Sequence, residues 1–218
     1  MGKTDLGMLY ASIHNEVEAR LEEFRVLWAH GSDSELLREL CFCICTPQTN
    51  AKRAWAAVNQ LADSGLLESG ADDSAAREML ASVLRGSGVR FHNNKAAYIA
   101  ANQRLFFPNP RSMIASILSH GVREARASLA LRVAGWGLKE ASHFLRNIGQ
   151  GSEICILDRH ILRQLVDYGV IAAMPRTLSA KVYLETERAM TCFAHDEGVP
   201  LDALDLILWF KAKGEVFR

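Results

Sequence analysis

A lysine directly after a glycine-rich segment is the first candidate for chemistry in this chain. The segment is Val133-Ala134-Gly135-Trp136-Gly137, and Lys139 follows two residues later. Apolar residues at 138, 141, 145 and 148 recur at three- and four-residue steps, which predicts a helix that starts near the lysine and ends at Gly149. Because the positive end of a helix dipole disfavours a cation, we expect the Lys139 amine to act as a nucleophile.

The glycine-rich segment reads as a hairpin that could hold an anion. Gly135 and Gly137 allow backbone angles that side chains forbid, so we expect bare N–H groups that face a phosphate, as at helix N-termini. About twenty residues after the lysine, Asp158 lies immediately before the next predicted helix. Its carboxylate could cap that helix or stabilise a positive charge, and the two roles are compatible because a cap fixes the carboxylate's direction.

Length and composition exclude several classes of protein. The chain has 218 residues, enough for one domain or two closely joined subdomains, and its formal net charge is zero. No run approaches the roughly eighteen apolar residues of a membrane span, and no signal-peptide pattern opens the chain, so we expect a soluble, cytoplasmic protein. The five cysteines form no Cys-x-x-Cys pair, which predicts reduced, mostly buried thiols and no iron–sulfur cluster.

The charges are distributed unevenly. Between residues 85 and 163 the chain carries twelve lysines and arginines against four acidic residues, and much of the compensating acid lies in the first eighty residues. Such an asymmetry permits a polyanion on one face although the net charge is zero. The twelve basic residues are Arg85, Arg90, Lys95, Arg104, Arg111, Arg123, Arg126, Arg132, Lys139, Arg146, Arg159 and Arg163.

Helical spacing of apolar residues recurs along the chain, and no alternating β pattern or fixed repeat appears, so the predicted fold class is all-α. The expected helices include 8–29, one from a Ser32–Ser34 cap to Pro47, one from Thr49 or Asn50 to Gly65, 74–85, one capped by Asn93 or Asn94, 183–193 and 201–210.

Several motifs together resemble a known family. The pattern L-x-x-x-G-x-G-x-K-x-A, followed by a lone aspartate, resembles the helix-hairpin-helix superfamily of DNA glycosylases in its bifunctional glycosylase/AP-lyase branch. From about Leu36 to the C-terminus the chain is similar to the type 2 family of 8-oxoguanine DNA glycosylase/DNA lyases. The motifs that carry this similarity are TPQT (46–49), GVRFHNNKAAYI (88–99), KEASHFLRNIG (139–149) and ILDRHILR (156–163).

The resemblance implies two helical subdomains with the active site in the cleft between them. A six-helix barrel containing the hairpin would cover residues 36–149, and residues 1–35 with 150–218 would form the other subdomain. Lys139 would attack the sugar C1′, expel the damaged base and form a Schiff base that permits strand cleavage by β-elimination. Asp158 would stabilise the cationic sugar and assist proton transfer.

The remaining predicted site residues would contact DNA. The hairpin residues Val133, Gly135 and Gly137 would grip the phosphate backbone while the base is flipped out. Gln48, at the polar corner 46–49, would fill the gap left by the flipped nucleotide; alone it also fits an ordinary turn residue. The residues expected to recognise the base are Asp205, Trp209, Phe91 and Arg218.

Base recognition rests on a carboxylate and a flat ring. Asp205 and Trp209 are four residues apart, so on a helix they share a face; the same spacing also fits a core tryptophan and a surface aspartate. Oxidation at C8 moves a proton to N7 of guanine, which a carboxylate can accept while an indole stacks on the base. The resembling family ends in a basic residue, usually lysine, whereas this chain ends in Arg218.

The expected partner is double-stranded DNA that contains 8-oxoguanine, bound by a monomer. No cofactor or metal is expected, although the hairpin leaves room for a monovalent cation. Two alternatives stay open. One is a glycosylase/lyase of the same fold for oxidised pyrimidines, against which the missing iron–sulfur cysteines and the C-terminal segment weigh. The other is a non-catalytic helix-hairpin-helix DNA-binding module, which would need neither Lys139 nor Asp158.

Overall fold

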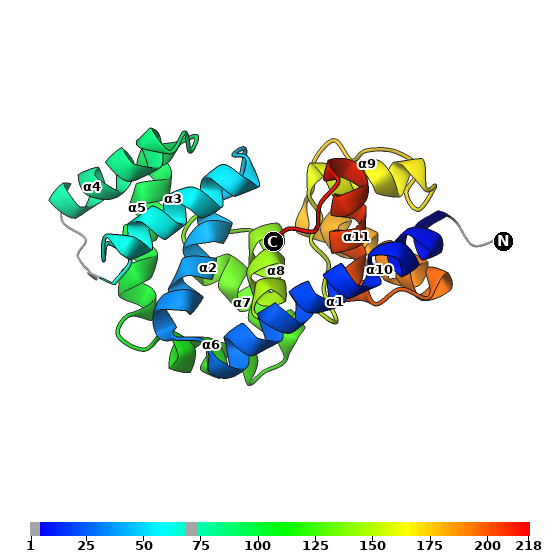
Figure 1. Cartoon of the computed structure of the whole chain (residues 1–218), viewed down its shortest axis with the longest axis horizontal. Coiled ribbons are helices and arrows are strands. Elements are labelled where there is room, and N and C mark those ends of the chain that lie inside the picture. Colours follow the sequence, from blue (N-terminus) through cyan, green and yellow to red (C-terminus); the bar gives the residue numbers. More distant parts are fainter. Residues whose placement is uncertain (1–4, 69–73) are drawn as a thin grey trace. The chain divides into compact units, whose positions relative to one another are not determined.

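The computed structural model describes residues 5–68 and 74–218 of the chain. Within these ranges it contains α-helices and no β-strand (Figure 1), which confirms the predicted all-α class. None of the described helices is long and apolar enough to span a membrane. The helices are α1 (Asp5–His30), α2 (Asp33–Cys45), α3 (Ala51–Asp63), α4 (Ser74–Gly86), α5 (His92–Phe106), α6 (Pro110–Leu118), α7 (Val122–Arg132), α8 (Leu138–Asn147), α9 (Arg159–Asp167), α10 (Ala180–Glu197) and α11 (Leu201–Lys213).

The chain divides into two compact units. The hairpin unit is Leu27–Phe144, and the terminal unit combines Met1–Val26 with Leu145–Arg218. The chain passes from one unit to the other twice, once within α1 and once within α8. The subdomain limits expected from the sequence, with breaks after residues 35 and 149, stay a prediction.

Helix α2 forms the centre of the hairpin unit. It packs against α3, α5 and α6, and nine of its thirteen residues are buried, so it is enclosed on several sides. Its start is fixed by the predicted cap: the Ser32 hydroxyl accepts a hydrogen bond from the Glu35 N–H, and the Glu35 carboxylate accepts one from the Ser32 N–H at 2.7 Å. The thiols of Cys41, Cys43 and Cys45 lie in this core.

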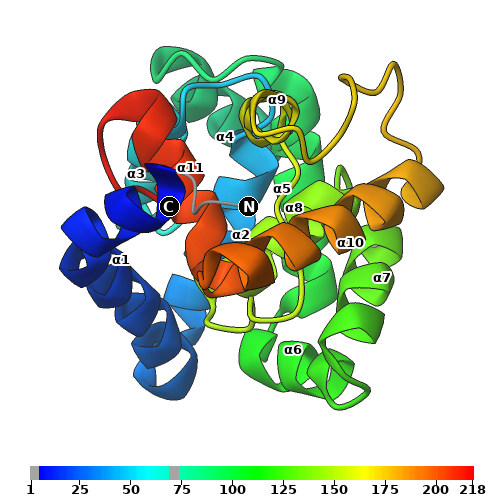
Figure 2. The ribbon, with the colours of Figure 1, turned by 90° about the vertical axis from the view of Figure 1, so that its right-hand side faces the viewer.

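Helix α11 holds the terminal unit together. It packs against α9 and α10 (Figure 2), and residues 203–208 are buried without interruption. The Gln164 side-chain amide donates to the Leu208 carbonyl at 2.5 Å, which ties α9 to α11. At the surface, Lys211 Nζ donates to Asp5 Oδ2 at 2.9 Å and to the Tyr168 hydroxyl at 2.6 Å, so the start of α1 and the end of α9 meet the same lysine.

Candidate active site

Helices α7 and α8 flank the predicted hairpin, and one glycine in it has no substitute. Gly135 has φ +83°, and a Cβ there would lie 2.4 Å from Cδ2 of Tyr98, so both the backbone conformation and the packing exclude a side chain. Gly137 is different. Its φ is not in the left-handed region, and a Cβ there would meet nothing closer than Glu140 Oε2 at 3.7 Å. The expectation that both glycines serve backbone freedom was therefore wrong for Gly137.

A buried asparagine on α5 forms two hydrogen bonds with the backbone of the hairpin. The Asn102 side chain, only 2% exposed, donates to the Ala134 carbonyl at 3.1 Å and accepts from the Ala134 N–H at 2.9 Å. This amide pair satisfies both backbone groups of a residue that no helix ladder serves. Next to it Val133 is buried, with 3% of the whole residue exposed, so the phosphate contact predicted for this residue stays a prediction.

Lys139 lies in the first turn of α8, as predicted, and its neighbour Glu140 was overlooked. The Glu140 carboxylate accepts a hydrogen bond from the Gly137 N–H at 3.1 Å, and it lies 3.8 Å from Lys139 Nζ. The prediction that Gly137 offers a bare N–H to an anion is therefore wrong for the DNA-free protein. The Glu140 carboxylate therefore acts on the Lys139 amine in addition to the helix dipole.

Asp158 is the N-cap of α9. Its Oδ1 accepts hydrogen bonds from the N–H groups of His160 and Ile161, each at 2.8 Å. The capping role that the sequence left open is therefore present. Both bonds use the same oxygen, which fixes the position of Oδ1 and leaves Oδ2 outside the cap.

The segment before Asp158, residues 154–157, is buried and lies outside any helix, and two side chains of α10 bond to its backbone. The Cys155 N–H donates to Glu187 Oε1 at 2.8 Å, and the Tyr183 hydroxyl donates to the Cys155 carbonyl at 2.6 Å. The same hydroxyl accepts the Leu157 N–H at 3.3 Å. These bonds satisfy buried backbone groups that no helix serves, and they hold the segment that leads to Asp158.

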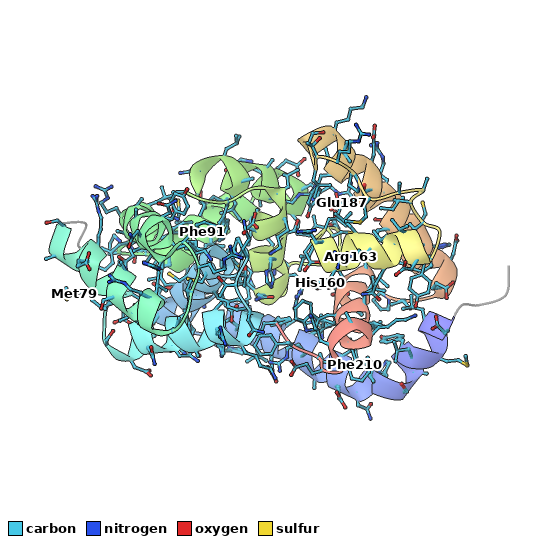
Figure 3. The ribbon with its side chains drawn as sticks, turned by 90° about the horizontal axis from the view of Figure 1, so that it is seen from above. Met79, Phe91, His160, Arg163, Glu187 and Phe210 are labelled. Carbon is cyan, nitrogen blue, oxygen red and sulfur yellow. The ribbon has the colours of Figure 1, made fainter. Side chains whose placement is uncertain are left out.

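Two predicted DNA-contacting residues share an unusual backbone conformation. Gln48 has φ +55° and Phe91 has φ +57°, and both side chains are exposed. Phe91 marks the start of α5 (Figure 3), which begins at His92. The prediction that Asn93 or Asn94 caps this helix was wrong, because the chain enters α5 through the left-handed Phe91 without a side-chain cap.

The structure of α11 excludes one of the alternatives for Asp205 and Trp209, the one in which the aspartate lies at the surface. Asp205 is 8% exposed and its Oδ2 lies 2.9 Å from Arg146 Nη2, so the carboxylate forms a buried ion pair rather than facing solvent. Trp209, one turn later, is half-buried and meets the His160 ring edge-on at a centroid distance of 5.8 Å. The Arg218 guanidinium lies 5.7 Å from the centroid of the Phe24 ring. Their roles towards a base stay predictions.

Burial dominates the electrostatics of Asp205. It raises the pKa of this carboxyl to about 6, while the nearby Arg146 acts in the opposite direction and Asp202 and Asp158 add to the rise. The Arg146 guanidinium also lies over the Phe24 ring, with Cζ 4.9 Å from its centroid. The ion pair therefore sits in an apolar setting where the charged carboxylate is only partly compensated.

Changing Asp205 to Asn should alter how the free energy of unfolding depends on pH. Since its folded-state pKa lies near 6 and the ordinary value is 3.8, the folded protein binds more protons through this group between those values. Its contribution to stability is thus fullest below about pH 4 and is lost as the pH rises through 6. The wild type should lose stability relative to Asp205→Asn across this window, by at most about 1.4 kcal/mol per pH unit.

Urea denaturation of the wild type and Asp205→Asn from pH 4 to pH 7 measures that difference. A wild type that gains stability relative to the variant as the pH rises would show that the Arg146 ion pair outweighs burial.

The chain is similar to proteins of known family, in sequence and in structure. The sequence model of a family described as 8-oxoguanine DNA glycosylase matches residues 17–199. The chain belongs to this family. The 8-oxoguanine DNA glycosylase/AP lyase of Fusobacterium nucleatum is 36% identical, over 98% of this chain and 96% of the relative. The enzyme of the same name from Methanocaldococcus jannaschii is 34% identical, over 95% of this chain and 94% of that one.

Solved structures of 8-oxoguanine DNA glycosylases also match almost the whole chain. The 8-oxoguanine DNA glycosylase of Thermotoga maritima superposes with a TM-score of 0.86 at 31% identity, covering 98% of this chain and 97% of that one. The Methanocaldococcus jannaschii 8-oxoguanine glycosylase/lyase, in complex with a 15mer DNA containing 8-oxoguanine, gives 0.86 at 31% identity and covers 99% of this chain and 100% of that one.

Sequence reasoning identified the candidate nucleophile and carboxylate of this glycosylase family member but missed the residues that support them. The sequence does contain a signal for Asn102, because this polar residue lies among the apolar positions of its helix, where a buried hydrogen-bonding role can be suspected. Tyr183 and Glu187 carried none, because they lie far along the chain from the segment that they hold. Three of the twelve basic residues counted in the sequence, Lys95, Arg126 and Arg146, are buried, so the basic surface is smaller than that count suggested.

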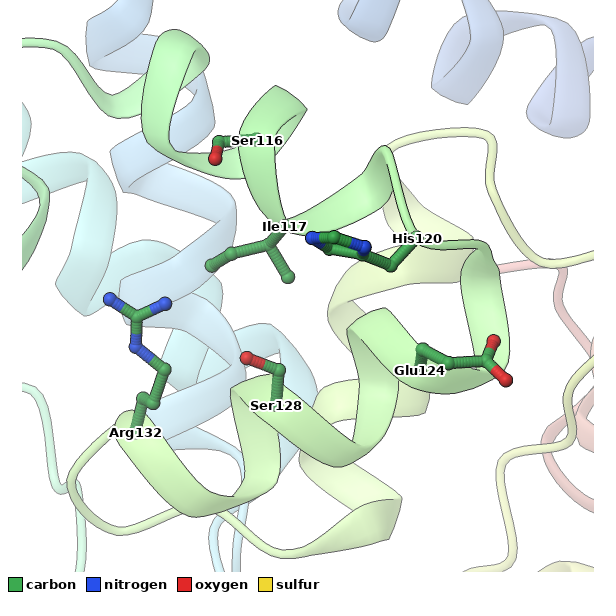
Figure 4. Close-up of a pocket in the computed structure, with 6 residues that line it drawn as sticks. All are labelled: Ser116, Ile117, His120, Glu124, Ser128 and Arg132. Atoms are coloured by element: carbon green, nitrogen blue, oxygen red, sulfur yellow. The ribbon is translucent and has the colours of Figure 1, made fainter.

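A pocket of about 430 Å³ lies between α6 and α7 (Figure 4). None of the predicted site residues lines it. Within residues 5–68 and 74–218, no three His, Cys, Asp or Glu side chains lie close enough to hold a metal ion. The lining residues are Ser116, Ile117, His120, Glu124, Ser128 and Arg132.

Proposed function

We propose that this protein repairs DNA by excising 8-oxoguanine and then cleaving the strand at the resulting abasic site. The observation that carries the proposal is Lys139 in the first turn of α8, directly after the hairpin, in a chain that belongs to the 8-oxoguanine DNA glycosylase family. The names of its relatives combine glycosylase and AP-lyase activities, which one amine nucleophile can provide.

In the proposed reaction the Lys139 nitrogen bonds to C1′ of the damaged nucleotide as the C1′–N9 bond breaks. The electron pair of that bond leaves with the base, which also takes up a proton. Opening of the sugar ring then gives a Schiff base between Lys139 and C1′. Loss of a C2′ proton expels the 3′ phosphate by β-elimination, and water finally releases the lysine. No step gains or loses electrons overall, so the reaction requires no redox partner.

Asp158 supplies the counter-charge in this proposal. The positive charge that develops on the sugar would be stabilised by a carboxylate whose direction is set before DNA arrives. The cap on α9 supports such preorganisation, because Oδ1 is already engaged by two N–H groups while Oδ2 is outside the cap. The same carboxylate could receive and return the protons that the later steps move.

The hairpin would hold the DNA backbone while the base leaves the helix. A base in a duplex must be extruded before its glycosidic bond can be reached, and the extrusion needs a fixed grip on the phosphates. Gly135 supports this role because its lack of a side chain brings the hairpin backbone to the surface above Tyr98.

Borohydride trapping on a duplex with one 8-oxoguanine tests the function. We expect a covalent protein–DNA complex, release of 8-oxoguanine and a strand break, with none of these on the same duplex carrying guanine. A third duplex with an oxidised pyrimidine separates the first alternative, since equal trapping there would assign the activity to pyrimidine lesions. Tight binding without trapping or base release would indicate a non-catalytic DNA-binding module.

A further inference from the structure

Lys95 is a buried lysine whose amine is used entirely within the protein. Its side chain lies on α5 and is 4% exposed. Nζ donates to the carbonyls of Cys45 and Pro47, each at 2.8 Å, and to Thr49 Oγ1 at 3.0 Å. Burial lowers the pKa of Lys95 to about 8, so the amine is still mainly charged at pH 7. A buried ammonium is unfavourable unless its donors are satisfied, and here all three acceptors belong to the end of α2 and the turn after it.

The same network reaches a second turn. Thr49 Oγ1, which accepts from Lys95, also accepts the Arg90 N–H at 3.2 Å. The Lys95 amine is bonded to Thr49, so through this hydroxyl it also reaches Arg90, the residue before Phe91. The turn at 47–49 is therefore joined to the turn at 90–91, although about forty residues of chain separate them.

Each of these turns contains a left-handed residue that is not glycine. Gln48 and Phe91 are the two such residues in the part of the chain that the structure describes. This conformation costs about 1–2 kcal/mol for a residue with a side chain, and it persists where the surroundings determine it. Both side chains point into solvent, Phe91 with 52% of its surface exposed. The network thus maintains two strained turns that each display a side chain at the surface.

We propose that Lys95 is a positioning residue that holds Gln48 and Phe91 together as one preformed wedge for the DNA duplex, which gives Phe91 a place in the base stack instead of the base-recognition role that the resemblance implied. The inference rests on the proposed function, and it adds the device that prepares the opened duplex. A side chain that enters a base stack loses less entropy if its backbone is already fixed in the inserted conformation. The amine holds the turn of Gln48 directly and the turn of Phe91 through the Thr49 hydroxyl, so the two residues should move as a unit.

Lys95→Met removes the three donors and keeps the length of the side chain, so it should loosen the turn of Gln48 directly and the turn of Phe91 through Thr49. The decisive measurement uses a duplex with a non-cleavable abasic-site analogue and 2-aminopurine opposite it, because 2-aminopurine brightens when it loses its stacking neighbours. At saturating protein, Lys95→Met should give less than about half the wild-type fluorescence change, since an unfixed wedge inserts only part of the time. Excision of 8-oxoguanine from a paired duplex should slow by about tenfold, which corresponds to the loss of about 1.4 kcal/mol of positioning energy.

Two further variants complete the test. Lys181→Met on α10 removes an exposed lysine with the same change of charge and should match the wild type in both assays. Thr49→Val removes the shared acceptor but leaves Lys95 its two carbonyls, so it should reduce the fluorescence change to a smaller degree. Adding Thr49→Val to Lys95→Met should reduce it little further, because both changes act on one unit.

A wild-type fluorescence change at saturating Lys95→Met would overturn the inference, because it would show that the wedge inserts fully without the amine. A slower excision in this variant would not alter that conclusion. If Lys95→Met fails to fold, a wild-type change in Thr49→Val would overturn it equally. Failure of the proposed function would appear differently, as a wild-type protein that neither releases 8-oxoguanine nor forms the borohydride cross-link.

Discussion

Lys139→Gln should form no borohydride cross-link with an 8-oxoguanine duplex and should release the base at least about a thousandfold more slowly than the wild type. Glutamine keeps a polar side chain of similar reach, but its amide nitrogen does not add to C1′, so the covalent path is lost. Binding to the lesion should be largely retained, because the hairpin and its Asn102 support do not involve the amine. Single-turnover base release, gel-based trapping and a binding titration measure the three quantities.

Lys181→Gln provides the matched control for this variant. It makes the same chemical change at a lysine on α10 whose side chain is 84% exposed, and it should behave as the wild type. Undiminished cross-linking in Lys139→Gln would assign the nucleophile to another amine. Loss of cross-linking together with loss of binding would instead point to damage to the hairpin.

Asp158→Asn should slow base release by about a hundredfold or more while leaving the protein folded and bound to DNA. Asparagine caps helices about as well as aspartate, so its side-chain oxygen can still accept the His160 and Ile161 N–H groups. What disappears is the negative charge that would face the sugar. The variant therefore separates the two roles of Asp158, which an alanine substitution would remove together.

The thermal midpoint and the single-turnover rate of Asp158→Asn should be measured on the same preparation. A lowered midpoint with normal turnover per folded molecule would leave Asp158 as a helix cap alone. Asp158→Ala offers a useful comparison, since it should lose both the rate and about 1 kcal/mol of stability through the missing cap.

Most helices could be predicted from local patterns, because a helix with one apolar face repeats every three to four residues and its caps lie next to it. Ser32, Lys139 and Asp158 were therefore located correctly at helix starts. The start of α5 was not, because the chain enters it through the left-handed Phe91, and the Arg90 N–H beside that residue donates to Thr49, about forty residues away along the chain. No local pattern distinguishes such a residue from an ordinary loop residue.

Long-range partners explain the other differences. The buried state of Asp205 depends on Arg146, which lies on another helix, so spacing along α11 alone suggested a surface aspartate as one alternative. The hydrogen bonds of Tyr183 and Glu187 to the segment before Asp158 could likewise not be predicted from local patterns. The types of the reacting residues follow from the sequence, whereas their environment depends on contacts that only the folded chain brings about.

The hydrogen bond from the Gly137 N–H to Glu140 gives the hairpin a resident anion before any DNA arrives. If the hairpin grips phosphate, binding there is an exchange, and the affinity gained is the difference between a phosphate and a tethered carboxylate. A tethered competitor acts at a high effective concentration, so only a strong, well-aligned acceptor displaces it. Weak anions and poorly placed phosphates are then rejected, and a loop that might have held any nucleic acid loosely becomes selective for a backbone presented in one geometry.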